Sequence, residues 1–271
     1  MKIPVTFLTS YMYCKRKFFL EQIAGIIEPP KEVLVKGRIK HNVFDLANKQ
    51  ERGIILSIKN DNKQEIIQRY RESYAKNLKN ILLINKNSLK QLNIQLSDAY
   101  NELWSYFEEE SITRAENIHN FLKTKKIFGK ELWDALTPKI ESEIYVESDN
   151  LQLKGKVDRI EKYDETIIPV ELKTGKAPKE GVWQEHMIQI GAYMLMLGEV
   201  LGKKTVVGKV KYIKNNISRE VHMNPFLQEE IKRLVKEVQE FLEKKNIPNF
   251  TKNKAKCESC GLREDCYYFE T

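Results

Sequence analysis

Side chains that could act together on a phosphate ester lie on two neighbouring predicted strands. Asp158 belongs to the run GKVDR at 155–159, and Glu171 and Lys173 share one face of the next strand, because strand residues i and i+2 point the same way. If these strands pair, Asp158 approaches Glu171, and two close carboxylates repel each other unless a cation lies between them. An oxygen-rich site of this kind suits Mg²⁺ or Mn²⁺, which would polarise a phosphoryl oxygen and lower the pKa of a bound water.

Lys173 and three more side chains could complete this chemistry. Lys173 could hold the attacking water or stabilise charge on the phosphate. His41, on a predicted helix, could ligate the metal as a neutral imidazole, and Gln189 and Tyr193 are spaced four residues apart and so share a helical face. Gln189 could orient a water, and Tyr193 could stack on a base or hydrogen-bond a phosphate. Each feature alone also fits a structural role: a surface ion pair, a capping or core histidine, or the boundary of an amphipathic helix.

The cysteines form a second candidate site. Cys257, Cys260 and Cys266 occur within ten residues, and Cys14 supplies a fourth thiol from the other end of the chain. Four thiolates can hold Zn²⁺ or an iron–sulfur cluster, and from spacing alone structural zinc is slightly favoured. A disulfide is less favoured in a reducing compartment, and a free buried Cys14 is the alternative for that residue.

Hydrophobic periodicity and turn residues predict the elements that position these residues. The stretch 63–136 has a helical pattern throughout and no chemical motif, so we interpret it as a helical insert or cap. Pro169 predicts an irregularity just before Glu171, and Asn224 with Pro225 predicts a helix start. Helices are predicted over 6–22, 32–50, 182–201 and 225–245, and strands over 140–147, 151–162, 166–173, 205–214 and 217–223. This order predicts an α/β (α+β) fold in which helices flank a mixed sheet.

Composition and net charge indicate which kinds of binding partner suit the chain. The chain has 271 residues, 46 Lys plus Arg against 38 Asp plus Glu, a net charge of +8 and a pI of about 9.1. This excess suits a polyanionic partner, although a solvated basic surface is the alternative. Neither a membrane-spanning segment nor a secretion signal is recognisable, so we expect a cytoplasmic protein that does not bind membranes.

Taken in order, the motifs resemble the RecB-like branch of the PD-(D/E)xK nucleases. They are G-x-x-x-H at 37–41, G-x-x-D-R at 155–159, E-x-K at 171–173 and Q-x-x-x-Y at 189–193. The resemblance implies a restriction-endonuclease-like core. It implies that a divalent metal is held by His41, Asp158, Glu171 and the backbone carbonyl of Leu172. Lys173 would be the catalytic lysine, and Gln189 and Tyr193 would complete the site and touch the DNA; Glu143 is a further candidate acid.

One cysteine before these motifs and three after them is similar to the CRISPR-associated exonuclease family, the fourth of the Cas families. That resemblance implies a [4Fe–4S] cluster that joins the C-terminal segment to the N-terminal helix, with ligands Cys14, Cys257, Cys260 and Cys266. It covers 1–50 and 138–271. A second resemblance is to iron–sulfur nuclease domains of helicase–nucleases.

These resemblances lead to a functional expectation. The chain is expected to be a metal-dependent exonuclease of single-stranded DNA, with 5′→3′ polarity and endonuclease activity as a further option. It would process spacer precursors in CRISPR adaptation beside the integrase complex. The alternatives are a stand-alone RecB-like repair nuclease and a non-catalytic, cluster-stapled DNA-binding or scaffolding subunit. The expected parts are N-terminal helices (1–62), a helical insert (63–137), a nuclease core (138–224) and a C-terminal helix with the cysteine segment (225–271).

Overall fold

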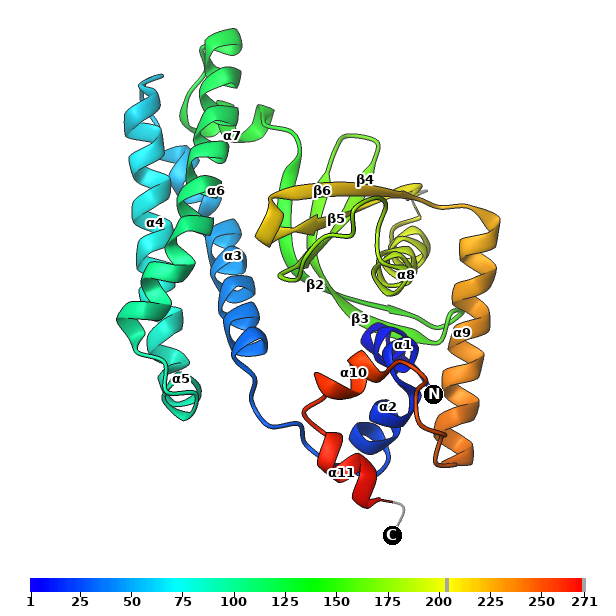
Figure 1. Ribbon diagram of the computed structural model, residues 1–271. Coiled ribbons are helices and arrows are strands. Elements are labelled where there is room, and N and C mark those ends of the chain that lie inside the picture. The colour runs from blue at the N-terminus through cyan, green and yellow to red at the C-terminus, as the bar shows by residue number, and fades with distance from the viewer. Residues whose placement is uncertain (203–204, 270–271) are drawn as a thin grey trace. The chain divides into compact units, whose positions relative to one another are not determined.

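The computed structural model describes residues 1–202 and 205–269, and its internal contacts divide the chain into two compact units (Figure 1). The first unit comprises 1–29, 143–160 and 165–271, and the second comprises 30–142 and 161–164. Residues 270–271, which end the predicted C-terminal segment, lie outside the described residues. No helix among the described residues combines the length and the apolar character needed to cross a bilayer.

A mixed sheet forms the framework of the first unit. Hydrogen bonds order its strands β1-β3-β4-β5-β6, and β2 pairs with β3. The pairs β1–β3 and β4–β5 are parallel, whereas β5–β6 is antiparallel. The strands are β1 (Ile3–Pro4), β2 (Lys139–Ser148), β3 (Leu153–Lys162), β4 (Ile167–Lys173), β5 (Val207–Tyr212) and β6 (Ile217–His222). The predicted fold class, helices beside a mixed sheet, is confirmed.

β4 is an inner strand of this sheet although it contains a proline. Its register with β5 begins at Val170, one residue after Pro169, and continues through Lys173. The missing N–H of Pro169 therefore falls before this ladder, where its loss disturbs no β4–β5 pair. β4 thus delivers Glu171 and Lys173 from a regularly paired segment.

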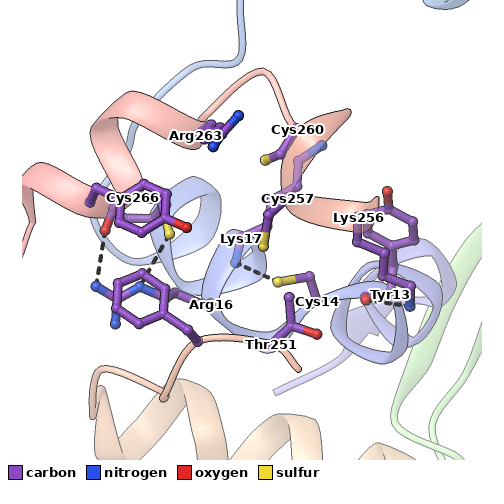
Figure 2. A pocket seen from close by; sticks show the side chains of 13 residues that line it. Tyr13, Cys14, Arg16, Lys17, Thr251, Lys256, Cys257, Cys260, Arg263 and Cys266 are labelled. Carbon is purple, nitrogen blue, oxygen red and sulfur yellow. Dashed lines mark hydrogen bonds between the residues drawn. The ribbon is translucent and has the colours of Figure 1, made fainter. Parts of the chain in front are cut away.

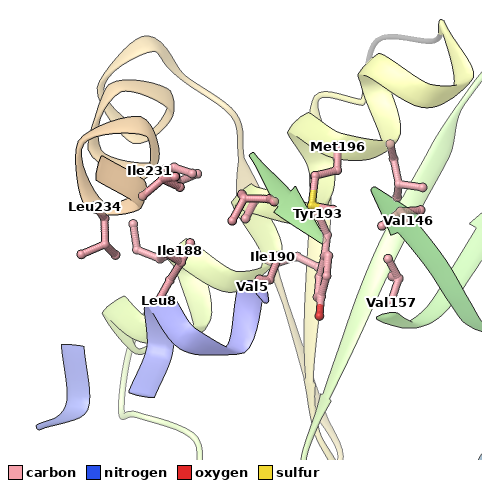
Figure 3. Close-up of a cluster of buried hydrophobic side chains, with 14 of the residues drawn as sticks. Val5, Leu8, Val146, Val157, Ile188, Ile190, Tyr193, Met196, Ile231 and Leu234 are labelled. Carbon is pink, nitrogen blue, oxygen red and sulfur yellow. The ribbon is translucent and has the colours of Figure 1, made fainter. Parts of the chain in front are cut away.

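Two helices build the core against the sheet. α8 (Gln184–Leu201) packs on β4 and β5, and α9 (Pro225–Lys244) packs on α8 (Figure 1). Figure 3 shows their buried side chains: Ile188, Ile190 and Met196 come from α8, and Ile231 and Leu234 from α9. α9 begins as predicted, because the Asn224 side chain accepts a hydrogen bond from the N–H of Leu227 (2.9 Å) and Pro225 takes the first helical position. A short 3₁₀ turn, η1 (Ile213–Asn215), links β5 to β6.

The N-terminal helix is not continuous, and here the prediction of one helix over 6–22 is wrong. The structure has α1 (Val5–Tyr13) and α2 (Lys15–Gln22), separated by Cys14 in an extended conformation with φ −161° and ψ 111°. The Cys14 thiol caps α2 by accepting from the N–H of Lys17 (3.4 Å). The break turns the cysteine away from the regular helical path. In the C-terminal segment, two short helices, α10 (Lys254–Glu258) and α11 (Arg263–Tyr268), carry or adjoin the other three cysteines.

The second unit is mainly helical, and its stretch 63–136 forms helices as predicted. α4 and α6 make its most extensive contact, and Phe44, Tyr74 and Phe107 pack their rings together. Buried Arg114 pairs with Glu51 (3.1 Å) and Glu110 (3.0 Å), so its charge is compensated inside the unit. The helices are α3 (Glu32–Leu56), α4 (Lys63–Ile84), α5 (Lys86–Gln91), α6 (Leu96–Lys125) and α7 (Gly129–Ala135).

Candidate active site

Two adjacent strands bring the acidic motifs together. Asp158 lies on β3 and its Oδ2 accepts a hydrogen bond from the backbone N–H of Leu172 on β4 (2.8 Å). Since Leu172 is the middle residue of the E-x-K motif, this bond places the Asp158 carboxylate beside Glu171 and Lys173. The Leu172 side chain is buried on the opposite face, which leaves its backbone and its two neighbours to form the site.

Gln189 joins the two members of the E-x-K motif. Its amide N–H donates to Glu171 Oε1 (2.7 Å), and its Oε1 accepts from Lys173 Nζ (2.7 Å). Lys173 also forms an ion pair with Glu171 at 3.0 Å. Glu171 is 4% exposed and Gln189 5% exposed, so a buried amide holds this direct ion pair at a site that is largely shielded from solvent.

Tyr193 supports this arrangement from the interior. It is buried among apolar side chains that include Val5 and Val157 (Figure 3). Burial raises the pKa of Tyr193 well above its ordinary value, and the carboxylates of Glu171 and Asp158 raise it further, while hydrogen bonds with Gln189 and the backbone of Lys156 lower it. The phenol is therefore neutral, and both carboxylates act on it electrostatically.

Gly155 explains the glycine of the G-x-x-D-R motif. A Cβ at this position would lie 2.8 Å from Cε1 of Tyr193 and 3.2 Å from Cγ2 of Val5. Glycine lets the Tyr193 ring rest directly on β3, and α8 can then bring Gln189 to Glu171. The motif thus contributes the Asp158 carboxylate and, through Gly155, the close approach of α8 to β3.

Glu143 lies beside Asp158, as its place on the preceding strand allows. Carboxylate oxygens of the two residues approach within 4.8 Å, and Glu143 also forms an ion pair with Lys156. The backbone of Glu143 has φ +57°, a left-handed conformation that is uncommon for a residue other than glycine. This conformation interrupts the strand alternation at the position where the acid faces Asp158.

Three of the four histidines, His41, His186 and His222, differ in their surroundings. His186 Nδ1 lies 3.1 Å from the hydroxyl of Tyr212, the residue that pairs in register with Lys173. Burial, and then the positive charge of Lys173, lower the pKa of His186 from 6.5 to about 4, so the ring is neutral near pH 7. His222 is exposed near Glu220, away from this set. His41 lies on α3 in the second unit, and its role as a ligand stays a prediction.

The four cysteines line a single pocket of the first unit (Figure 2). All four are free thiols, and the pocket is formed by α2, α10, α11 and the residues beside them. Among the described residues, no three of these sulfur atoms lie within 4.8 Å of one another. The pocket therefore brings the thiol of residue 14 and the three thiols of 257–266 to one place.

Arg16 also lines this pocket, and the sequence motifs did not single it out. It is 2% exposed, and its Nε donates to Cys266 Sγ at 3.2 Å. Burial raises the pKa of the Cys266 thiol, and the Arg16 guanidinium acts in the opposite sense. The only sequence signal was a cation two residues after Cys14 and close before the apolar pair Phe18-Phe19.

Comparisons with known proteins identify the family of the chain. The sequence profile of the PD-(D/E)XK nuclease superfamily matches residues 3–267. The chain is 28% identical over 154 residues to a CRISPR-associated exonuclease Cas4/endonuclease Cas1 fusion of Leptospira interrogans serogroup Icterohaemorrhagiae serovar Lai (strain 56601), covering 53% of this chain and 28% of the fusion. It is 25% identical over 280 residues to the DNA replication ATP-dependent helicase/nuclease dna2 of Schizosaccharomyces pombe (strain 972 / ATCC 24843), covering 99% of this chain and 18% of that protein.

The chain therefore spans less than a third of the length of either relative. Among solved structures, SSO0001 aligns with a TM-score of 0.33 and 15% identity, covering 81% of this chain and 93% of that one. The profile match runs over nearly the full length, and it includes the strands that bring Asp158 beside the E-x-K motif. On these grounds the chain belongs to the PD-(D/E)XK nuclease superfamily.

Proposed function

We propose that this nuclease hydrolyses phosphodiester bonds of DNA at the site built on Asp158, Glu171 and Lys173. The observation that carries the proposal is the position of Gln189, which bonds both Glu171 and Lys173. A surface ion pair gains little and needs no third residue to hold it. A buried amide that fixes an acid and a cation 3.0 Å apart is what a preorganised catalytic pair requires.

The donor set of this site fits Mg²⁺ or Mn²⁺. Asp158 and Glu171 offer carboxylate oxygens, the Leu172 backbone offers a carbonyl, and we propose His41 as a further ligand; hard divalent cations prefer such oxygen-rich sets. The proximity of the Asp158 carboxylate to the Leu172 backbone supports this choice. When bound, the ion would polarise the scissile phosphate and lower the pKa of a water.

The chain's own residues would then divide the work. Lys173 would hold the attacking water or stabilise negative charge on the phosphate, since its ammonium is already oriented by Gln189. Gln189 and Tyr193 would act by holding Glu171 and Lys173 in place. Tyr193 is 2% exposed, so burial favours this supporting role over the expected contact with DNA.

For the substrate, we propose single-stranded DNA with a free end, cut in the 5′→3′ direction. The net charge of +8 supports a polyanionic substrate, and the relative from Leptospira is described as a Cas4 exonuclease fused to a Cas1 endonuclease. By this likeness we propose a cytoplasmic role in CRISPR adaptation beside an integrase. The similarity to a replication helicase/nuclease supports a second candidate, a nuclease of DNA repair or replication.

For the cysteines, we propose that Cys14, Cys257, Cys260 and Cys266 hold a [4Fe–4S] cluster. Four free thiols around one pocket form a suitable donor set, and the N–H of Lys17 and Arg16 Nε already donate to sulfur. Purified protein should be brown, with stoichiometric iron; colourless protein with stoichiometric zinc would rule the cluster out.

The nuclease proposal is tested with end-labelled single-stranded DNA and Mn²⁺. Wild-type protein should degrade the DNA, and Asp158→Ala should lose at least about 100-fold in rate, the scale on which one catalytic group contributes. Glu165→Gln, which changes an exposed carboxylate in the turn after β3, is the matched control and should retain full activity. Comparing the degradation of DNA labelled at the 5′ end with that of DNA labelled at the 3′ end determines the polarity of cleavage. Binding without cleavage by both wild type and Asp158→Ala would instead identify a scaffolding subunit.

A further inference from the structure

Arg16 is a fully buried cation at the cysteine pocket. Its guanidinium donates from Nε to Cys266 Sγ (3.2 Å), from Nη2 to the Cys266 carbonyl (3.0 Å) and from Nη1 to the Pro248 carbonyl (2.8 Å). The Phe250 ring lies against it, with the guanidinium carbon 4.0 Å from the ring centroid. Figure 2 shows Arg16 on α2 with both of its bonds to Cys266.

All of these partners lie more than 230 residues away in the chain. A planar fork of donors that meets one sulfur and two carbonyls fixes its partners in position and orientation, which a lysine ammonium cannot do. Arg16 therefore orients Cys266, the cysteine of the C-terminal segment that is farthest along the chain. The buried positive charge of Arg16 therefore lies in direct contact with Cys266 Sγ, the atom that would become a negatively charged ligand when a cluster binds.

The pocket has an unequal distribution of donors to sulfur. Cys266 Sγ receives a hydrogen bond from a cation, and Cys14 Sγ receives one from the backbone N–H of Lys17. Hydrogen bonds to ligand sulfurs and the net charge around a cluster are two of the factors that set its reduction potential. A cationic donor stabilises the reduced cluster more than the oxidised cluster, because reduction adds negative charge to the cluster and its thiolates.

We propose that Arg16 is a positioning residue of the cluster site, which holds Cys266 by a charged N–H···S hydrogen bond and raises the reduction potential of the bound cluster. This inference rests on the proposed [4Fe–4S] cluster. It concerns what one residue outside the ligand set does to that cluster. It is independent of whether Asp158 and Lys173 cleave DNA.

The test is the midpoint potential of the cluster, measured by spectroelectrochemistry on the anaerobically purified full chain. Arg16→Gln should shift the potential to a more negative value and should lose iron to a chelator several-fold faster than wild type. Arg263→Gln is the matched control, because Arg263 is an exposed cation that lines the same pocket. It removes the same charge without removing a bond to sulfur, so its potential should stay close to that of wild type.

Arg16→Lys covers the case in which Arg16→Gln does not fold. It keeps the positive charge and loses the fork, so the potential should again fall below that of wild type, and the Fe–S stretching bands in resonance Raman spectra should shift. An unchanged potential and unchanged bands in an iron-replete Arg16→Lys protein would overturn the inference. Equal shifts in Arg16→Gln and Arg263→Gln would also overturn it, since long-range charge would then be the cause. Zinc in place of iron in wild type would remove its basis, while the Asp158→Ala assay would still decide the nuclease proposal.

Discussion

At the scale of single residues, Gly155 sets how closely α8 approaches β3. Gly155→Ala would place a Cβ 2.8 Å from the buried ring of Tyr193. Alanine restricts the unfolded chain and would by itself stabilise the fold by at most about 1 kcal/mol. Overpacking costs about 1–3 kcal/mol and dominates here, because the Tyr193 ring is hydrogen-bonded and cannot move freely. We therefore expect urea denaturation to show a net loss of stability, accompanied by reduced nuclease activity.

Gly53→Ala is the control for this change. Gly53 lies within α3, and a Cβ at this position would meet no atom of another element within 4 Å in the described part of the chain. Alanine there should stabilise the helix by about 0.5–1 kcal/mol. A Gly155→Ala protein as stable and as active as wild type would contradict the role assigned to the contact between Gly155 and Tyr193.

The charged residues of the site were predictable from the sequence. The residues that position them through packing or long-range contacts were not. Asp158, Glu171 and Lys173 lie on the predicted strands, and the period of two places the last two on one face. Gly155 acts through a Tyr193 contact that depends on how α8 packs, and no local pattern encodes that packing. Arg16 is similar, because its partners come from residues 248–266.

At the scale of elements, the loop between β4 and α8 joins Lys173 to the helix that carries Gln189. Arg219 on β6 donates to the carbonyls of Pro178 (2.9 Å), Lys179 (2.9 Å) and Gly181. Gly181 has φ +60°, a conformation that glycine adopts without strain. One guanidinium thus donates hydrogen bonds to three backbone carbonyls of the loop that have no partner in a helix or strand ladder.

Arg219→Ala should loosen this loop. Hydrogen bonds from a charged donor contribute about 1.5–3 kcal/mol each, but water can replace some of them at a partly exposed loop, so a net loss near 2 kcal/mol is expected. Limited proteolysis should cut within 174–183 more readily, and kcat should fall because Lys173 and Gln189 lose their common support. Arg233→Ala, which removes an exposed pair with Glu237 on α9, should change stability by less than about 0.5 kcal/mol. Equal effects of the two changes would argue against a special role for Arg219.

The break at Cys14 shows the limit of periodicity at this scale. Residues 6–22 contain neither glycine nor proline, and their apolar spacing continues through Cys14, so a single helix is the natural prediction. Cysteine is not among the usual N-cap residues. In the structure the thiol caps α2 and faces the pocket that also holds Cys257, Cys260 and Cys266. A tertiary site therefore overrides local helix propensity.

At the scale of the whole molecule, the cysteine pocket joins the two ends of the chain within the first unit. α2 contributes Phe19 and Leu20, which pack against Leu262 from the C-terminal segment. Glu28 accepts from the N–H of Gly261 (2.9 Å), and Lys256 Nζ donates to the carbonyl of Tyr13 (2.8 Å). This apolar contact is small, so the bound metal group is expected to supply most of the free energy that holds the ends together.

Cys14→Ser should therefore damage the fold more than the chemistry. Metal sites that couple to folding contribute on the order of 10 kcal/mol, so losing one ligand should lower the free energy of unfolding by several kcal/mol. Limited proteolysis should release the segment after α9, beginning between 245 and 253, and wild type stripped of metal by a chelator should behave in the same way. Lys15→Ser, a change at the exposed neighbouring residue, should leave the digestion pattern unaltered.

Because Asp158, Glu171 and Lys173 lie on β3 and β4, the initial rate of DNA cleavage by Cys14→Ser should fall far less than that of Asp158→Ala. If Cys14→Ser kept its stability but abolished cleavage, the cysteines would serve the reaction itself and not the joining of the two ends.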